Sequence, residues 1–276
     1  MAACATEPSK GTDMQNDIAS PIKKVLDDGV MTVQINRPQK KNAVTLAMWK
    51  ELAQLFRSLE GDSNVRVVVL AGAGDCFSAG ADISEFSQVR ATPEQVAIYE
   101  DAVDGALSAI AKLPKPTIAA VSGVCFAGGL ALAASADFRV ADATAKFSVS
   151  AVRMGLVYNI SKCARLYQIV GLVQAKRILL TGQRFSAQEA LSLGLVDQVA
   201  DEDALRTAQV LAGALIEGAP LAIEGIKSIL EALATDTVDA RRLDLERRIR
   251  AADASEDHRE AVHAFAEKRR PMFQGR

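Results

Sequence analysis

The chain has 276 residues, of which 49% are hydrophobic and 24% are charged, which is an ordinary composition for a globular protein with a substantial core. Its formal net charge of −2 argues against non-specific binding of nucleic acid. The four cysteines are scattered, without Cys-x-x-Cys or Cys/His spacing, and therefore predict a reduced, cytoplasmic protein without a metal site.

In chain order, residues 1–20 have the composition of a disordered tail and lack the apolar segment of a secretory signal. No later apolar run is long enough to span a membrane, so no membrane partner is expected. Buried-strand patterns occupy 30–35, 65–72 and 117–123, and helical patterns occupy 45–59, 93–113, 160–180 and 186–193. Two short strands joined by a turn are predicted within 137–150, a further short strand within 194–199, and helices from Asp203 onward.

Strands and helices alternate through most of this pattern, which predicts an α/β fold. The last quarter reads as helical throughout and is predicted to form a separate layer. The expected division is therefore a tail at 1–20, a core at 21–200 and a helical region at 201–276.

Two of the predicted strands end in loops of small residues, AGDCFSAGADI at 73–83 and SGVCFAGG at 122–129. Small side chains let a ligand approach the backbone closely. If both loops lie at one edge of a sheet, they present two N–H groups to a single carbonyl oxygen, which is an oxyanion hole. The alternative is that the small residues only let helices pack close to the sheet. The glycines match neither of the common nucleotide-phosphate loop patterns.

Several ordered motifs resemble those of the enoyl-CoA hydratase/isomerase family, also called the crotonase superfamily. They are NRPQKKNAV (36–44), FSAGADISEF (77–86), KPTIAAVSGVCFAGGLALAASADFRVA (115–141), LLTGQRFSAQEALSLGLVDQV (179–199) and SEDHREAVHAFAEKRRPMFQGR (255–276). The resemblance covers nearly all of the chain beyond the tail. It implies a crotonase-like spiral of β-β-α units, an acyl-CoA-binding core, and a C-terminal helical layer that forms a homotrimer or a dimer of trimers.

The resemblance also implies an acyl-CoA thioester as substrate, with coenzyme A as part of that substrate and no separate cofactor. The two oxyanion-hole donors are then the backbone N–H groups of Ala81 and Gly128. The positions implied to contact coenzyme A are Lys41, Ala43, Ala79, Asp82, Ile83, Lys268 and Phe273, the last two on a neighbouring subunit. From the residues alone, Lys268 fits a solvated helix face equally well, and Phe273 fits simple packing.

At the reacting end of the implied pocket, the sequence departs from the family pattern. Ala131 and Ala151 stand where hydratases of the family carry glutamates, and Asn159 stands where dienoyl-CoA isomerases carry an aspartate. Because alanine can neither give nor take a proton, weak or no ordinary hydration is expected. Tyr158 is a candidate for a replacement catalytic group, with packing as its alternative.

Asp82 and Glu85 are further candidates for that group; their alternatives are a helix cap and a solvated loop residue, respectively. Cys125 and Cys163 are expected to be inert thiols in apolar surroundings. Three functions remain open. The chain is an active enoyl-CoA hydratase, or another lyase, isomerase or decarboxylase of acyl-CoA, as in fatty acid metabolism, with relocated acid–base groups; or a non-catalytic acyl-CoA binder; or an assembly subunit.

Overall fold

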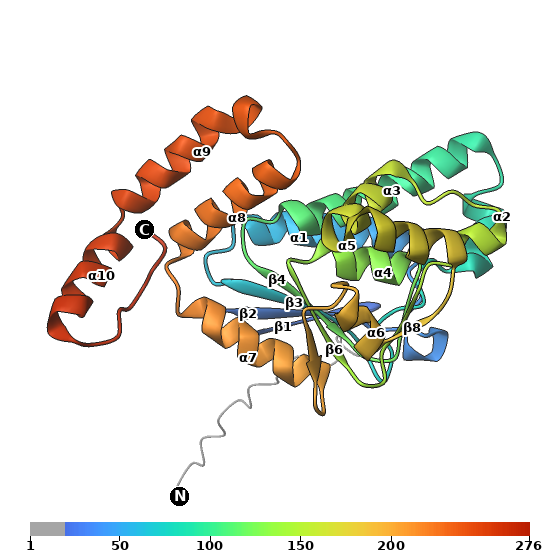
Figure 1. Ribbon diagram of the computed structural model, residues 1–276, viewed down its shortest axis with the longest axis horizontal. Coiled ribbons are helices and arrows are strands. Elements are labelled where there is room, and N and C mark those ends of the chain that lie inside the picture. The colour runs from blue at the N-terminus through green and yellow to red at the C-terminus, as the bar shows by residue number, and fades with distance from the viewer. Residues whose placement is uncertain (1–19) are drawn as a thin grey trace, which may run out of the picture.

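A six-stranded sheet forms the centre of the computed structural model, which describes residues 20–276 (Figure 1). The tail predicted at 1–20 thus lies outside the described residues apart from its last position. The strand order is β1 (Ile22–Asp27), β2 (Val30–Ile35), β3 (Val67–Gly72), β4 (Thr117–Val121), β6 (Phe138–Asp142) and β9 (Gln198–Ala200). Only β1 and β2 pair antiparallel; the other neighbours are parallel.

Helices cover both faces of this sheet, which is why β3 and β4 are apolar and buried along almost their whole length. The main core lies between one face and a layer of helices, while the other face packs against alanines of a single helix (Figure 1). The first layer contains α1 (Leu46–Glu60), α3 (Pro93–Lys112) and α4 (Gly128–Ser135), and the helix on the other face is α7 (Ala204–Ile216).

A small second sheet stands beside the first. It contains β5 (Val124–Phe126), β7 (Lys146–Ser148) and β8 (Phe185–Ser186). The remaining short elements are the 3-10 helices η1 (Pro38–Lys40), η2 (Ile83–Glu85) and η3 (Ala151–Met154), and the helices α2 (Phe86–Val89) and α6 (Ala187–Ser192). Helix α5 (Ile160–Thr181) is interrupted at Gly171, whose φ of 71° and ψ of 173° are not helical.

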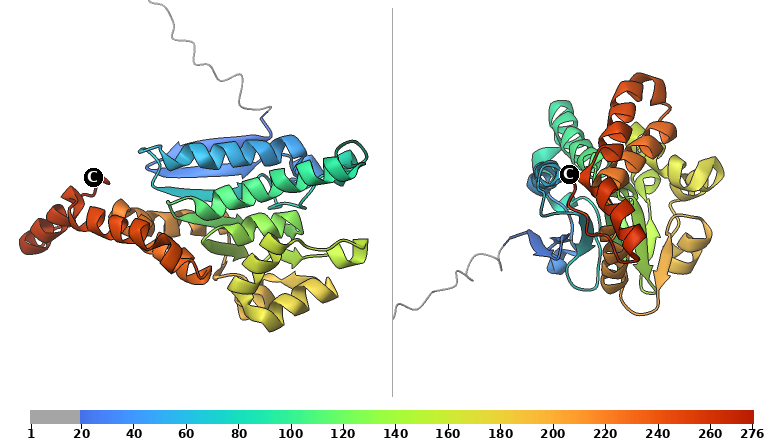
Figure 2. Two further views of the ribbon diagram at one scale, coloured as in Figure 1. Left: turned by 90° about the horizontal axis from the view of Figure 1, so that it is seen from above. Right: turned by 90° about the vertical axis from the view of Figure 1, so that its left-hand side faces the viewer.

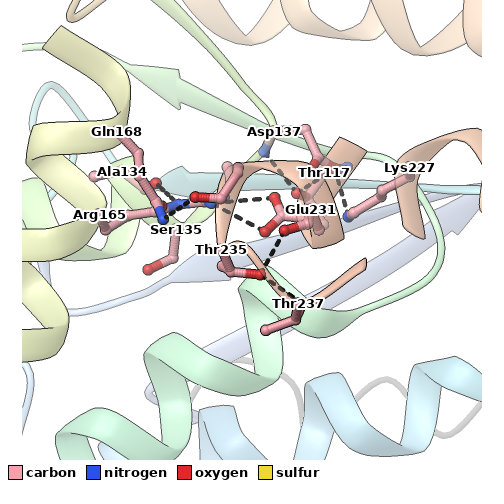
Figure 3. A network of polar contacts seen from close by, with 12 residues as sticks. Thr117, Ala134, Ser135, Asp137, Arg165, Gln168, Lys227, Glu231, Thr235 and Thr237 are labelled. Carbon is pink, nitrogen blue, oxygen red and sulfur yellow. Dashed lines mark hydrogen bonds and ion pairs between the residues drawn. The ribbon is translucent and has the colours of Figure 1, made fainter. Parts of the chain in front are cut away.

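The last three helices, α8 (Pro220–Ala234), α9 (Val238–Asp253) and α10 (Glu256–Glu267), form an arm that extends from one end of the sheet (Figure 2). Figure 3 shows how α8 is attached: Lys227 Nζ donates to Asp137 Oδ2 at 2.6 Å, and Arg165 pairs with Glu231 at 3.1 Å. Within residues 20–276 no single helix is long and apolar enough to cross a membrane, and α7 with α8 reaches that composition only as a pair bent by 109°.

The predicted α/β fold is confirmed, as are the three longer strands and the helices that follow them. The two short strands predicted within 137–150 are β6 and β7, but they belong to different sheets. Strands β1, β5 and β8 were not expected. Helix α7 lies against the central sheet, and the arm begins only with α8. The division into a core and a helical region at residue 200 stays a prediction.

Candidate functional site

The two loops of small residues meet at one edge of the central sheet. Because β3 and β4 are parallel neighbours, their carboxyl ends open onto the same edge. The loop after β3 then pairs with β5, since Ser78 N donates to Val124 O at 2.9 Å and Phe126 N donates to Ser78 O at 3.0 Å. The expected meeting of the two loops is thus found, and the small sheet is what holds them together.

Glycine is required where the loops touch. Gly80 has a φ of 93°, and a Cβ built on it would lie 2.7 Å from Phe126 O and 2.8 Å from Gly128 N. Real Cβ atoms do not approach backbone atoms so closely, so a larger residue would push the loops apart. A Cβ on Gly128 would in turn lie 3.3 Å from Ala81 N. Ala81 and Gly128, the two predicted donors, therefore lie beside each other.

Their backbone N–H groups are both left without a partner within residues 20–276, whereas one neighbour of each is bonded. Asp82 N donates to Val44 O at 2.9 Å, and Ala127 N donates to Ser148 O at 2.8 Å. Gly128 is also the first residue of α4, where helical N–H groups have no internal acceptor and the helix dipole is positive. Two adjacent unpaired donors are suited to a carbonyl oxygen that gains negative charge.

A third segment, residues 36–45, completes the wall of the site through Asn42. This side chain is fully buried: its Nδ2 donates to Ala73 O at 2.9 Å and to Cys76 O at 2.5 Å, and its Oδ1 accepts from Arg37 N at 2.9 Å. Sequence reasoning did not single out Asn42. Its φ of 53° suits asparagine, which tolerates this region better than most residues, but this angle is known only from the structure.

The predicted coenzyme A contacts of the core lie on these same segments. Ala79 N donates to Lys41 O at 2.9 Å, Ala43 is buried, and the side chains of Lys41 and Ile83 are exposed. Asp82 caps η2 through Ser84 N, as its alternative reading predicted, and also pairs with Arg37 at 2.9 Å. The hydrogen bond from Ser84, together with Arg37, lowers the pKa of Asp82.

Lys268 and Phe273 do not join this group within the chain. Lys268 caps the C-terminus of α10, a helix of the arm that lies at the opposite end of the molecule from α2 and α4 (Figures 1 and 2). Phe273 follows it in the chain, and its carbonyl accepts from Arg66 Nη1 at 3.5 Å, just before β3. Their predicted contact with coenzyme A across a subunit boundary stays a prediction.

The end of the site where the reaction is predicted is poor in free polar groups among the described residues. Ala131 is buried in α4 and lines a cavity of about 20 Å³ together with Tyr158 and Lys162. The Tyr158 hydroxyl donates to Ala127 O at 3.1 Å, and burial raises the pKa of this phenol, so it is neutral near pH 7. Ala151 begins η3 and is half-buried against the main core.

The other candidates are engaged elsewhere. Glu85 is not a solvated loop residue, because its Oε1 accepts from Leu46 N at 2.6 Å at the start of α1. Asn159 caps α5 and donates from Nδ2 to Asp104 at 3.0 Å. Cys125 is fully buried, which raises the pKa of its thiol well above the usual value, and burial also raises that of Cys163.

A charged cluster behind Tyr158 was also missed by sequence reasoning. Glu100 of α3 pairs with Arg90 at 2.7 Å and with Lys162 of α5 at 2.8 Å. Burial opposes ionisation of Glu100, but its hydrogen bonds to Lys162 and Arg90 outweigh burial and lower its pKa. The cluster fixes the start of α5, and with it the position of Tyr158.

Comparison with known proteins identifies the family. The sequence profile described as enoyl-CoA hydratase/isomerase matches residues 26–276. The chain belongs to this family. As an enoyl-CoA hydratase/isomerase family member, it is 34% identical over 255 residues to the 1,2-epoxyphenylacetyl-CoA isomerase of Escherichia coli K12, covering 91% of this chain and 97% of that relative.

Other relatives span the same length. The short-chain-enoyl-CoA hydratase of Clostridium acetobutylicum is 33% identical over 244 residues, covering 87% of this chain and 92% of its own. The crystal structure of a putative enoyl-CoA hydratase/isomerase family protein from Hyphomonas neptunium has a TM-score of 0.90 at 33% identity, covering 95% of this chain and all of that one. The family and fold expected from the sequence motifs are confirmed.

Proposed function

We propose that this enoyl-CoA hydratase/isomerase family member binds an acyl-CoA thioester with the thioester oxygen between the N–H groups of Ala81 and Gly128. The observation that carries the proposal is the pair of adjacent, unpaired N–H groups at the meeting point of the two loops. The names of the two relatives above, an acyl-CoA isomerase and an enoyl-CoA hydratase, agree with this substrate class.

Coenzyme A lies, in this proposal, along the segments that flank the two donors and arrives as part of the substrate. The backbone of Ala43 and Ala79, the exposed side chains of Lys41 and Ile83, and the η2 turn capped by Asp82 offer a positive charge, an apolar surface and small residues along one path.

The proposed chemistry is polarisation of the carbonyl without the carboxylates of a hydratase. Positioned acid–base groups each contribute about 10²–10⁴ in rate. Ala131 and Ala151 supply none, so ordinary hydration by this chain is weak or absent. An enolate formed without proton abstraction, as on loss of CO₂, still benefits from the two donors.

A relocated acid–base group is the second candidate, and the placement of Tyr158 favours it. This phenol lines the same small cavity as Ala131, where a family glutamate would stand. A phenol in that place serves as the single acid–base group of a hydratase when it gives its proton to the α-carbon and takes one back from the attacking water.

Self-association into a homotrimer or a dimer of trimers is part of the proposal and concerns the arm. Large apolar side chains of α9 and α10 are exposed, at 80% for Leu243 and 87% for Phe265, as is Met272 beyond them. Scattered exposed apolar residues are common, but several on one arm suit a partner subunit. A neighbouring arm then brings Lys268 and Phe273 to coenzyme A.

Exchange of the α-protons of acyl-CoA in D₂O, followed by mass spectrometry, tests the proposal. Binding of acyl-CoA without exchange, together with exchange in the variant Ala131→Glu/Ala151→Glu, indicates an intact oxyanion hole that lacks its base. The variant Ala131→Gln/Ala151→Gln is the matched control, since it adds the same bulk without a carboxylate. Exchange by the native chain indicates that an enolate forms and that a group other than the two missing carboxylates moves the proton, and absence of acyl-CoA binding contradicts the proposal.

A further inference from the structure

Tyr158 is bonded to the peptide unit that carries one of the two proposed donors. Its hydroxyl donates to Ala127 O at 3.1 Å, and this carbonyl shares one peptide unit with Gly128 N. In a trans peptide, the C=O and N–H bonds point in opposite directions within one plane. A group that holds the oxygen on one side therefore fixes the direction of the N–H on the other.

This peptide unit follows a strained residue. Ala127 has a φ of 44° and a ψ of −106°, a backbone conformation that residues other than glycine rarely adopt and that is strained for alanine. Such a conformation persists only when surrounding contacts enforce it. Here Ala127 N donates to Ser148 O at 2.8 Å, and Ala127 O accepts both from Ala131 N at 3.0 Å and from Tyr158.

We infer that Tyr158 is a positioning residue: its hydroxyl locks the Ala127–Gly128 peptide so that the Gly128 N–H is aimed at, and polarised toward, the thioester oxygen. This inference rests on the proposed function of Gly128 as a donor. It assigns to the phenol a role through the backbone, distinct from proton transfer to substrate.

Polarisation adds to orientation. A carbonyl that accepts hydrogen bonds withdraws electron density from the N–H of the same peptide unit, which strengthens that N–H as a donor. Ala127 O accepts two such bonds. Because burial holds Tyr158 in its neutral form, the hydroxyl keeps its proton and the bond persists at every pH near neutrality.

The surroundings of Tyr158 hold it in this place. The next residue, Asn159, caps α5 and bonds to Asp104, and Cys163 Sγ donates to Tyr158 O at 3.0 Å. The Lys162 ammonium lies 5.8 Å from the centre of the phenol ring and is itself held by Glu100. The charged cluster at Glu100 and Lys162 thus holds the phenol ring in position. The phenol in turn holds the Ala127–Gly128 peptide unit, which carries the proposed donor.

The test is the infrared carbonyl stretch of crotonyl-CoA labelled with ¹³C at the thioester carbon and bound to the protein. The native chain is expected to lower this frequency on binding. Tyr158→Phe is expected to bind with little change in Kd but a clearly smaller shift, and any turnover is expected to fall about fivefold, as for the loss of a hydrogen bond of ~1 kcal/mol. Tyr167→Phe, at an exposed tyrosine of α5, is the matched control and is expected to keep the full shift.

A full shift in Tyr158→Phe would overturn the inference. If Tyr158→Phe does not fold, Tyr158→3-fluorotyrosine keeps the shape and strengthens the donor, so the shift is expected to grow; an unchanged shift overturns the inference. If the native chain binds no crotonyl-CoA, the proposed function fails. The inference about Tyr158 is then tested in the free protein by NMR, where Tyr158→Phe is expected to shift the amide resonance of Gly128. An unchanged Gly128 resonance overturns the inference.

Discussion

Gly80 and Gly128 approach so closely that a Cβ on Gly80 would lie 2.8 Å from the Gly128 nitrogen. The two loops that carry the proposed donors are thus in backbone contact, with no side chain between them. The spacing of Ala81 N and Gly128 N consequently depends on the absence of side-chain atoms at this contact.

Gly80→Ala is expected to destabilise the protein by about 3 kcal/mol and to abolish acyl-CoA binding. The methyl group adds both strain at a φ of 93° and a clash with Phe126 O and Gly128 N. Urea unfolding and titration with crotonyl-CoA measure the two effects. Gly194→Ala is the control, because Gly194 has a φ of 73° but open space where the added Cβ would lie. This variant is expected to lose about 1–2 kcal/mol of unfolding free energy without loss of acyl-CoA binding. Equal effects of both variants would contradict the role of the contact.

Asn42→Ala is expected to cost about 3 kcal/mol of unfolding free energy and to weaken acyl-CoA binding. The substitution leaves Ala73 O, Cys76 O and Arg37 N without their buried partner. Asn64→Ala, at an exposed asparagine that bonds only to Asp62, is expected to change stability by under about 0.5 kcal/mol. Denaturant unfolding of both variants measures the two changes in stability. A similar small loss of unfolding free energy in both would show that Asn42 does not hold the loops.

Lys227→Met is expected to destabilise the protein by about 3 kcal/mol, because it leaves the largely buried Asp137 carboxylate without its cation (Figure 3). Asp137 retains Thr117 N at 2.7 Å, and so Asp137→Asn in the Lys227→Met background is expected to recover part of the loss. Arg242→Met breaks an exposed pair with Asp239 and serves as the control, with little change in the free energy of unfolding expected. A Lys227→Met protein as stable as the control would show that this pair does not anchor α8.

Glu224→Gln is expected to stabilise the protein at neutral pH and to have no effect in acid. Burial raises the pKa of Glu224, more than Lys115 and Arg248 lower it. The folded state therefore binds this proton more tightly than the unfolded state, and stability falls as pH rises from about the ordinary value of 4.5 through the raised pKa. The difference in unfolding free energy between variant and native chain, measured by urea at pH 4 to 8, should grow with pH. A difference independent of pH contradicts the assignment.

Local sequence patterns were sufficient for the strands and helices that are long and periodic, and for the meeting of the two loops. They were insufficient wherever pairing between distant segments decides the structure. Strand β5 is only VCF and exists because it pairs with β7 and is bridged by Ser78, and β6 and β7 belong to different sheets although a single turn joins them. The hydrogen bond from Asn42 to Cys76 O and the hydrogen bond from Tyr158 to Ala127 O also join segments far apart in the chain. The resemblance of the motifs predicted Ala81 and Gly128 as the two donors. The side chains that hold their loops in place, Asn42 and Tyr158, were identified only in the structure.

The dependence of the site on distant pairings has a consequence for the order of folding. The contacts between Asn42 and Cys76, and between Ser78 and Cys125, close long loops of chain, and contacts of this kind form late and slowly. Helix content should recover early in refolding, whereas affinity for acyl-CoA should return only with the last kinetic phase. Ligand binding is therefore the stricter assay of native protein, and a preparation with full helical circular dichroism but no binding contains chains whose loops have not yet joined.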